Sequence, residues 1–206
     1  MTDYPSPKKY QPKAGDILFQ DLDCGSLCLA IKEVTIGVDS AEFSHIGLVQ
    51  KVDNKWMVLE AISDGVKYTP LLEFFKRSLD KNQNPKIWVG RLKKEYRPIL
   101  ELLEPESYIG KAYDDVFLMD NEKYYCSELL YEIFKKANKG TDFFILEPMT
   151  FKSPKTQTFL PVWIDYYQKR GMEIPEGKAG INPAGISRSN KIEIVQKLGK
   201  VSKKTF

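Results

Sequence analysis

The sequence predicts an α+β fold built around an antiparallel sheet, with helices packed against it. Strand-like and amphipathic helical segments follow one another without the regular alternation that a parallel sheet requires. Two β-rich runs, at 43–50 and 55–62, flank Asp53-Asn54, a dipeptide that suits a tight hairpin turn. The length suffices for one compact core and is too short for two ordinary domains, so we expect residues 1–206 to form a single domain.

Before the hairpin, the chain is expected to form an arm, a strand and a helix. Residues 1–13 are rich in Pro and Lys and predict a loose N-terminal arm. The apolar run at 15–20 follows a glycine and predicts the first strand. Apolar residues at helical spacing predict a helix over 24–35, and Asp23 is placed to cap it.

After the hairpin, a helix is expected over 69–79, because Thr69 resembles an N-cap and Pro70 suits the first helical position. A strand at 86–92 and a partly helical stretch at 94–106 follow.

The C-terminal part is expected to hold two further helices and a last strand. An amphipathic helix begins at Cys126, and a second, aromatic-rich helix is predicted within 156–170. Residues 171–190 form a long segment rich in Gly and Pro, and the final strand is predicted at 191–198. Loops of this length within a domain are usually functional or disordered. We therefore expect either an ordered loop beside an active-site cleft or a surface connection to the last strand.

Composition excludes several classes of function. A formal net charge of +3 without a basic stripe argues against a nucleic-acid partner. No apolar run is long enough to cross a bilayer, and the N-terminus lacks the apolar centre of a signal peptide, although the location of the protein stays open. With one histidine and an odd number of cysteines, three, we expect no closed disulfide framework, no metal site and no cofactor.

Cys126 and His45 are the candidates for nucleophilic chemistry. Only a thiolate attacks, and the first turn of a helix stabilises that anion, so a cysteine at a helix start is well placed to react. His45 is the only imidazole in the chain, and it lies in a predicted strand. A helix end packed against a sheet would bring the thiol and its base together.

The predicted hairpin places a carboxylate beside the histidine. A two-residue turn pairs Val52 with Lys55 and sets His45 opposite Ile62. Glu60 then lies diagonal to His45 on the same face, about 7–8 Å away at the backbone. The carboxylate is within reach of one ring nitrogen, although a slip of one residue would send it to the opposite face.

Each candidate also has a structural explanation. Cys126 is also explained as a buried thiol of the core, His45 as a strand histidine whose hydrogen bonds are satisfied, and Glu60 as a charged residue on an edge strand. Cys24 is a rival nucleophile, but the neighbouring acidic residues would raise the pKa of its thiol. We therefore assign Cys24 and Cys28 structural roles and expect Cys28 to be buried.

Five segments, in this order, resemble the YiiX/YebB-like branch of the NlpC/P60 cysteine hydrolases: "GDILF", "FSHIGLV", "VLEA", "GKAYD" and "YYCSELL". The resemblance covers about residues 15–130 and implies a circularly permuted papain-like fold, in which the histidine precedes the cysteine. It implies that Cys126 is the nucleophile, His45 the general base and Glu60 the orienting residue, where many members have a histidine. Tyr113, with the backbone N–H of Cys126, would stabilise the oxyanion.

The resemblance implies a reaction type more firmly than a substrate. It predicts a thiol hydrolase that cleaves an amide in a peptide or amino-acid amide, such as the stem peptides of bacterial cell walls. A thiol acyltransferase or hydrolase acting on lipid-linked acyl groups would use the same residues, and a non-catalytic binding module is a third interpretation. A peptide substrate requires charged groups in the pocket, whereas a lipid substrate requires a long apolar groove.

Overall fold

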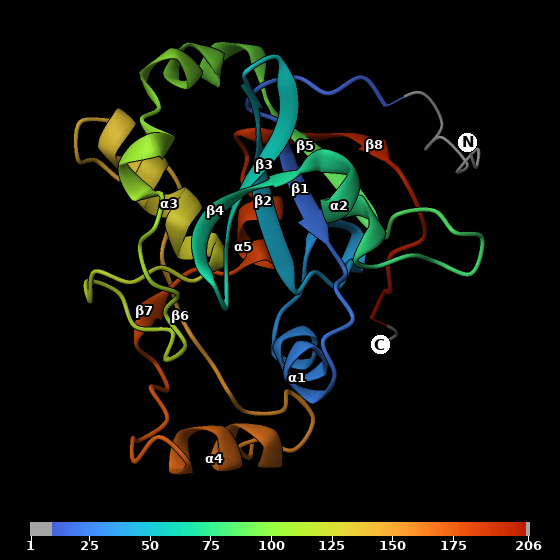
Figure 1. Ribbon diagram of the computed structural model, residues 1–206. Coiled ribbons are helices and arrows are strands. Elements are labelled where there is room, and N and C mark those ends of the chain that lie inside the picture. Colours follow the sequence, from blue (N-terminus) through green and yellow to red (C-terminus); the bar gives the residue numbers. More distant parts are fainter. Residues whose placement is uncertain (1–9, 205–206) are drawn as a thin grey trace.

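The computed structural model, which describes residues 10–204, confirms the α+β class (Figure 1). Its main sheet has the order β4-β3-β2-β1-β5-β8, and all neighbouring strands are antiparallel. The strands are β1 (Ile17–Gln20), β2 (His45–Val52), β3 (Lys55–Ile62), β4 (Gly65–Pro70), β5 (Ile87–Leu92) and β8 (Ile192–Lys197). A separate pair consists of β6 (Glu147–Pro148) and β7 (Ala179–Gly180).

The helices are short, and they include the expected helix that begins at Cys126. The α-helices are α1 (Ser26–Val34), α2 (Leu71–Lys76), α3 (Cys126–Ala137), α4 (Pro161–Gln168) and α5 (Pro183–Ser187). The 3-10 helices are η1 (Val38–Ser40), η2 (Lys94–Leu102) and η3 (Pro105–Tyr108), so the stretch at 94–106 is helical in part, as predicted. Of the expected N-terminal arm, residues 1–9 lie outside the described residues, and residues 10–13 have no regular structure.

Two apolar cores lie on opposite faces of the sheet, because successive side chains of a strand point to opposite faces. Ile17 and Phe19 of β1 belong to a core that α3 covers with Leu129 and Leu130. The intervening Leu18 belongs to a second core, which α2 covers. The larger core therefore fixes α3, and with it Cys126, against one face of the sheet.

Two expected helix starts are wrong. Asp23 does not cap α1, whose N-cap is Gly25; its carboxylate instead accepts from Lys86 Nζ at 2.7 Å. Thr69 and Pro70 end the edge strand β4, which the sequence did not reveal, and α2 starts only at Leu71. Proline is tolerated on an edge strand because no neighbour requires its missing N–H, so Thr-Pro indicates a strand end here.

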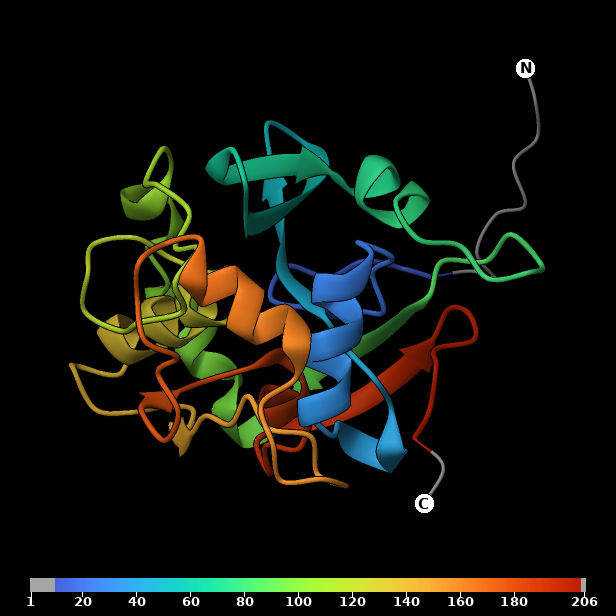
Figure 2. The same ribbon diagram turned by 90° about the horizontal axis from the view of Figure 1, so that it is seen from below.

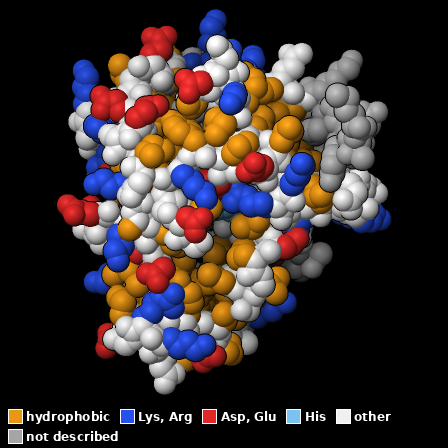
Figure 3. Space-filling view, in the orientation of Figure 1, with side chains coloured by type: hydrophobic (Ala, Val, Ile, Leu, Met, Phe, Trp, Pro, Cys, Tyr) orange, Lys and Arg blue, Asp and Glu red, His pale blue; other side chains and the backbone are white. Residues whose placement is uncertain are grey.

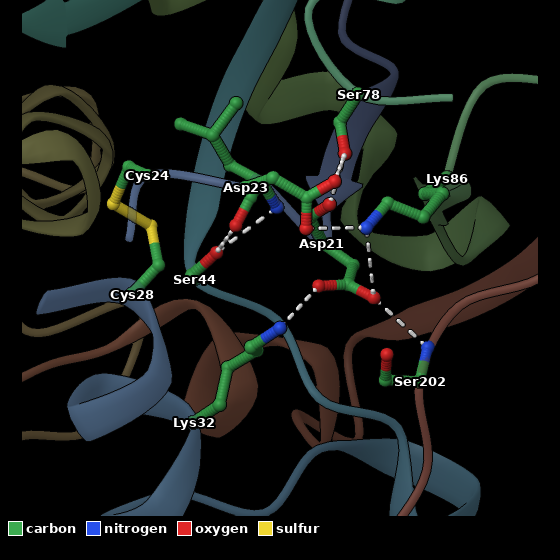
Figure 4. Close-up of polar contacts among 10 residues, drawn as sticks. Asp21, Asp23, Cys24, Cys28, Lys32, Ser44, Ser78, Lys86 and Ser202 are labelled. Carbon is green, nitrogen blue, oxygen red and sulfur yellow. Dashed lines mark hydrogen bonds and ion pairs between the residues drawn. A yellow bond between two sulfur atoms is a disulfide. The ribbon is translucent and has the colours of Figure 1, made fainter. Parts of the chain in front are cut away.

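Helix α1 packs beside α4, and a buried ion pair joins it to the residue that follows β1 (Figures 2 and 4). The Asp21 carboxylate is fully buried and accepts from Lys32 Nζ at 2.8 Å and from the backbone N–H of Ser202 at 2.9 Å. Lys86 Nζ lies 3.6 Å from the same carboxylate. Burial raises the pKa of Asp21, but the bonds from Lys32 and Ser202 outweigh it and lower the pKa below 3.8. The pair joins α1 to the sheet and to the C-terminal segment.

A disulfide joins Cys24 and Cys28 at the start of α1 (Figure 4). Cys28 is buried, as predicted, and in the bridge neither cysteine has a free thiol. The bridge itself was not foreseen: the odd number of cysteines excluded a fully paired set and did not exclude one local bridge. Cys126 is the free cysteine that the bridge leaves.

We expect Asp21→Asn to lower the free energy of unfolding by about 3 kcal/mol or more, because it leaves Lys32 buried without its counter-charge. Urea denaturation at pH 7 measures the change. The difference between wild type and variant should become smaller in acid, because the pKa of the Asp21 carboxyl is lower in the folded protein than its ordinary value of 3.8. The stability that the carboxylate contributes is therefore complete above pH 3.8 and is lost as the pH falls through the lower, folded pKa.

Asp23→Asn is the matched control, because the Asp23 side chain is 63% exposed and its surface pair with Lys86 contributes about 1 kcal/mol or less. Equal losses in the two variants would contradict the anchoring role of Asp21.

Candidate active site

Cys126 is the first residue of α3 and lies 7% exposed in the wall of a cavity. The residue before it, Tyr125, is extended, and its backbone N–H donates to Glu128 Oε2 at 3.3 Å. The Tyr125 hydroxyl accepts from the backbone N–H of Ile181 at 3.1 Å, and Ser127 Oγ donates to the carbonyl of Ile181 at 3.0 Å. The start of α3 is thus held on both sides of the cysteine.

The hairpin of β2 and β3 has the register predicted from the sequence. Val52 pairs with Lys55, and the pairing continues to Leu48 opposite Leu59. Both turn residues, Asp53 and Asn54, have positive φ values of 47° and 60°, as a type I′ turn requires.

This register brings the predicted carboxylate to the histidine. Glu60 Oε2 lies 2.6 Å from His45 Nε2, and the Glu60 side chain is fully buried. Since Nε2 bonds to Glu60, Nδ1 is the ring nitrogen left for Cys126, which lines the same cavity as His45 and interacts with it electrostatically. The structure therefore brings together the three residues that the sequence selected from two strands and a helix.

The charges of this group stabilise a protonated imidazole. Burial lowers the pKa of His45, but its interactions with Cys126 and Glu60 outweigh burial and raise the pKa to about 9. Burial raises the pKa of Glu60, but His45 and Arg77 outweigh it and lower the pKa to about 2. At neutral pH the pair is therefore a carboxylate and an imidazolium.

Two further residues hold Glu60 and were missed from the sequence. Thr69 Oγ1 donates to Oε1 at 2.5 Å, and Arg77 Nη2 donates to Oε1 at 2.8 Å and to Oε2 at 2.6 Å. Thr69 was assigned to a helix cap, so its place on β4 was not foreseen. One signal was present: Glu60 is a carboxylate within an apolar run, and burying it requires more than one donor.

Tyr113 lies in the same cavity wall as Cys126. It forms a parallel bridge with Tyr124, two residues before the cysteine. Burial raises the pKa of Tyr113, and negative charge on Cys126 raises it further, so the phenol is neutral and available as a donor. This position is compatible with the oxyanion role that the resemblance implies.

The cavity has a volume of about 830 Å³ and extends from Cys126 and His45 between α1, α4 and the β6–β7 pair. Figure 3 shows a hollow with apolar side chains in this region, in the lower half of the view. Its apolar wall includes Leu27, Ile31 and Val34 of α1, Met149, Phe151 and Trp163. Its charged lining residues are paired: Arg77 bonds to Glu60, and Arg188 lies 3.1 Å from Glu147.

The segment at 171–190 contributes directly to this cavity. Ile181, Asn182, Pro183 and Arg188 line it, so the segment lies beside the cysteine, which agrees with the first of the two expected alternatives. It is not a continuous loop, because it contains β7 and α5. Asn182 caps α5 by accepting from the Gly185 N–H at 2.7 Å.

Both acidic residues after Tyr113 have partners within the protein. Asp114 is fully buried and accepts from the backbone N–H groups of Val116 and Leu118, and Asp115 pairs with Arg170 at 3.0 Å.

Between residues 10 and 204, no group of three or more His, Cys, Asp or Glu side chains is arranged to hold a metal ion. Within the same range, no helix has the length and hydropathy needed to span a bilayer.

His45 on an antiparallel sheet thus lies near Cys126 at a helix start, and the histidine precedes the cysteine in the chain, as the resemblance to permuted papain-like enzymes implies. A family model described as a permuted papain-like amidase enzyme, the YaeF/YiiX or C92 family, matches residues 11–196. The chain therefore belongs to this family. The match confirms the expected permuted papain-like fold and the YiiX-like branch, and it identifies the chain as an amidase-type hydrolase.

Two relatives support the assignment. The uncharacterized protein YiiX of Escherichia coli strain K12 is 26% identical over 190 residues, which cover 91% of this chain and 88% of the relative. A crystal structure of YiiX from Escherichia coli O157:H7, described as a metalloprotein, has a TM-score of 0.73 and 25% identity. That match covers 91% of this chain and 98% of the other.

We expect the imidazole of His45 to titrate with a midpoint near pH 9, well above its ordinary 6.5. Since the chain has one histidine, NMR of protein labelled at histidine gives a single titrating signal. Because this pKa is raised, the stability that the imidazolium contributes is complete below pH 6.5 and is lost as the pH rises through about 9.

Glu60→Gln should lower the midpoint, because the amide removes the negative charge that stabilises the imidazolium. A wild-type midpoint near 6.5, or no change in the variant, would contradict the geometry described here.

Proposed function

We propose that Cys126, His45, Glu60 and Tyr113 form the active site of a thiol hydrolase that cleaves an amide bond. The bond between His45 Nε2 and Glu60 Oε2, at 2.6 Å, is the observation that carries the proposal, because it directs the other ring nitrogen to the cysteine. The assignment of the chain to an amidase family supports the reaction type. The roles of the four residues are our inference from their positions.

In the first half of the reaction, the Cys126 sulfur attacks the carbonyl carbon of the amide. The neutral hydroxyl of Tyr113 and the backbone N–H of Cys126 donate to the developing oxyanion. The C–N bond then breaks, and His45 gives its proton to the leaving amine. The product of this half is a thioester on Cys126 and a free amine.

In the second half, a water molecule replaces the amine. His45, now neutral, removes a proton from the water, which attacks the thioester carbonyl. The C–S bond breaks, the carboxylic acid leaves, and Cys126 and His45 return to their starting states. Glu60 orients the imidazole and stabilises its charged form in both halves.

The cavity favours a substrate with an apolar acyl group. Its walls are mainly aliphatic and aromatic, and its charged residues already have partners in Glu60 and Glu147. A peptide with a free amine or carboxylate would find no unpaired counter-charge among these lining residues. We therefore favour an N-acyl amide over a cell-wall peptide, and we keep acyl transfer to a second acceptor as the alternative reaction of the same site.

We expect kcat/KM on a series of N-acyl anilides to rise with acyl length, by about fourfold for each buried CH2 group, which corresponds to roughly 0.8 kcal/mol. Release of the chromogenic amine measures the rate. Cys126→Ala should abolish it. Ile31→Trp should reduce the rate with long acyl groups and leave short ones almost unchanged, because the indole fills part of the cavity beside α1.

Leu29→Trp is the matched control on the same helix, since Leu29 is 63% exposed and does not line the cavity. The hydrolase proposal fails if the Cys126→Ala protein keeps its activity. The apolar-substrate proposal fails if the two Trp variants behave alike or if acyl length has no effect. A chain that binds these compounds without turnover would be a binding module.

A further inference from the structure

The Glu60 carboxylate is shared between two cations. His45 Nε2 and Arg77 Nη2 each lie 2.6 Å from the same oxygen, Oε2. Arg77 Nη2 also bonds to Oε1 at 2.8 Å, where Thr69 donates as well. Burial explains why the carboxylate needs several donors, but a second, charged donor on the oxygen that holds the histidine also shares the negative charge of that oxygen.

Arg77 is held in this position by the ring that also packs on the histidine. Its guanidinium carbon lies 4.6 Å from the centre of the Phe74 ring, a cation–π distance. The His45 ring lies 5.7 Å from the same ring, at 31°. Phe74 is fully buried in α2, so the helix fixes the two cationic groups relative to each other.

We propose that Arg77 is a positioning residue that shares the Glu60 carboxylate with His45 and so limits how strongly the carboxylate holds the protonated imidazole. The inference rests on the proposed function and deepens it. Neither Arg77 nor Thr69 touches the reacting atoms in this scheme. Both act through Glu60.

The chemistry explains why such a limit is useful. In the proposed reaction His45 must release its proton to the leaving amine, and an imidazolium held too tightly by an undivided carboxylate is a weak acid. A second cation nearby disfavours the charged imidazole and draws part of the carboxylate charge away from it. Glu60 of β3 and Cys126 of α3 interact with the histidine directly. The other charged or titratable groups around it are Arg77 at the C-terminal end of α2, which bonds to Glu60, and Tyr113, which lines the same cavity.

Arg77→Gln tests the proposal in the resting protein, where no substrate is needed. The histidine signal should titrate about one pH unit higher than in the wild-type protein, since the charge that opposes protonation is gone. Arg77→Met, whose unbranched stem still packs on Phe74, serves the same purpose should the Gln variant not fold. Arg77→Lys keeps the charge and should leave the midpoint close to that of the wild type.

Arg97→Gln is the matched control, because Arg97 pairs with Glu193 on the surface and lies outside the cavity. An unchanged midpoint in both uncharged Arg77 variants, or a fall toward 6.5, overturns the proposal, and so does a Lys variant that shifts as far as Gln. A purely structural role would produce that fall, because a loosened site loses the Glu60 contact. The proposed function is tested separately, and it fails if the Cys126→Ala protein still hydrolyses the substrate.

Discussion

The hydrogen bond between His45 and Glu60 is the interaction on which the site depends. Burying a carboxylate in a sheet is strongly unfavourable unless several donors satisfy it. Here β2, β4 and the end of α2 each supply a donor to Glu60, so the carboxylate joins two strands and a helix end. The same contact that stabilises a buried charge also orients the imidazole.

The rest of the fold brings the Cys126 thiol and the apolar cavity to this pair. Helix α3 packs against the sheet through the larger core, and the backbone of Ile181 hydrogen-bonds to Tyr125 and Ser127, the residues on both sides of Cys126. Helix α1, fixed by the Asp21–Lys32 pair, forms the apolar wall opposite. The proposed catalytic residues and the apolar cavity therefore depend on different contacts, so a substitution in the α1 wall alters the cavity and leaves the His45–Glu60 pair in place.

The sequence was most informative where local rules determine geometry. Asp53-Asn54 set the hairpin register, and the register alone placed Glu60 beside His45. The helix start at Cys126 was visible in the apolar periodicity. These features need only the period of a strand or helix and the chemistry of a turn.

Contacts between distant segments were not predictable in the same way. Thr69 reaches Glu60 because β4 pairs with β3, and Arg77 reaches it from the C-terminal end of the following helix, α2. From the sequence, Thr69-Pro70 indicated a helix start, but the pair lies where an edge strand ends. The apolar cavity is assembled from segments near residues 27, 117, 149, 163 and 181, which no local pattern connects.

Alkylation of the folded protein with iodoacetamide, followed by mass spectrometry under non-reducing conditions, tests most directly whether Cys126 is an activated nucleophile. At pH 7 the label should appear on Cys126, with Cys24 and Cys28 still bridged, and His45→Gln should slow the reaction strongly, because it removes the imidazolium that stabilises the thiolate. An inert Cys126 in the folded protein, or a rate that does not depend on His45, would contradict the account.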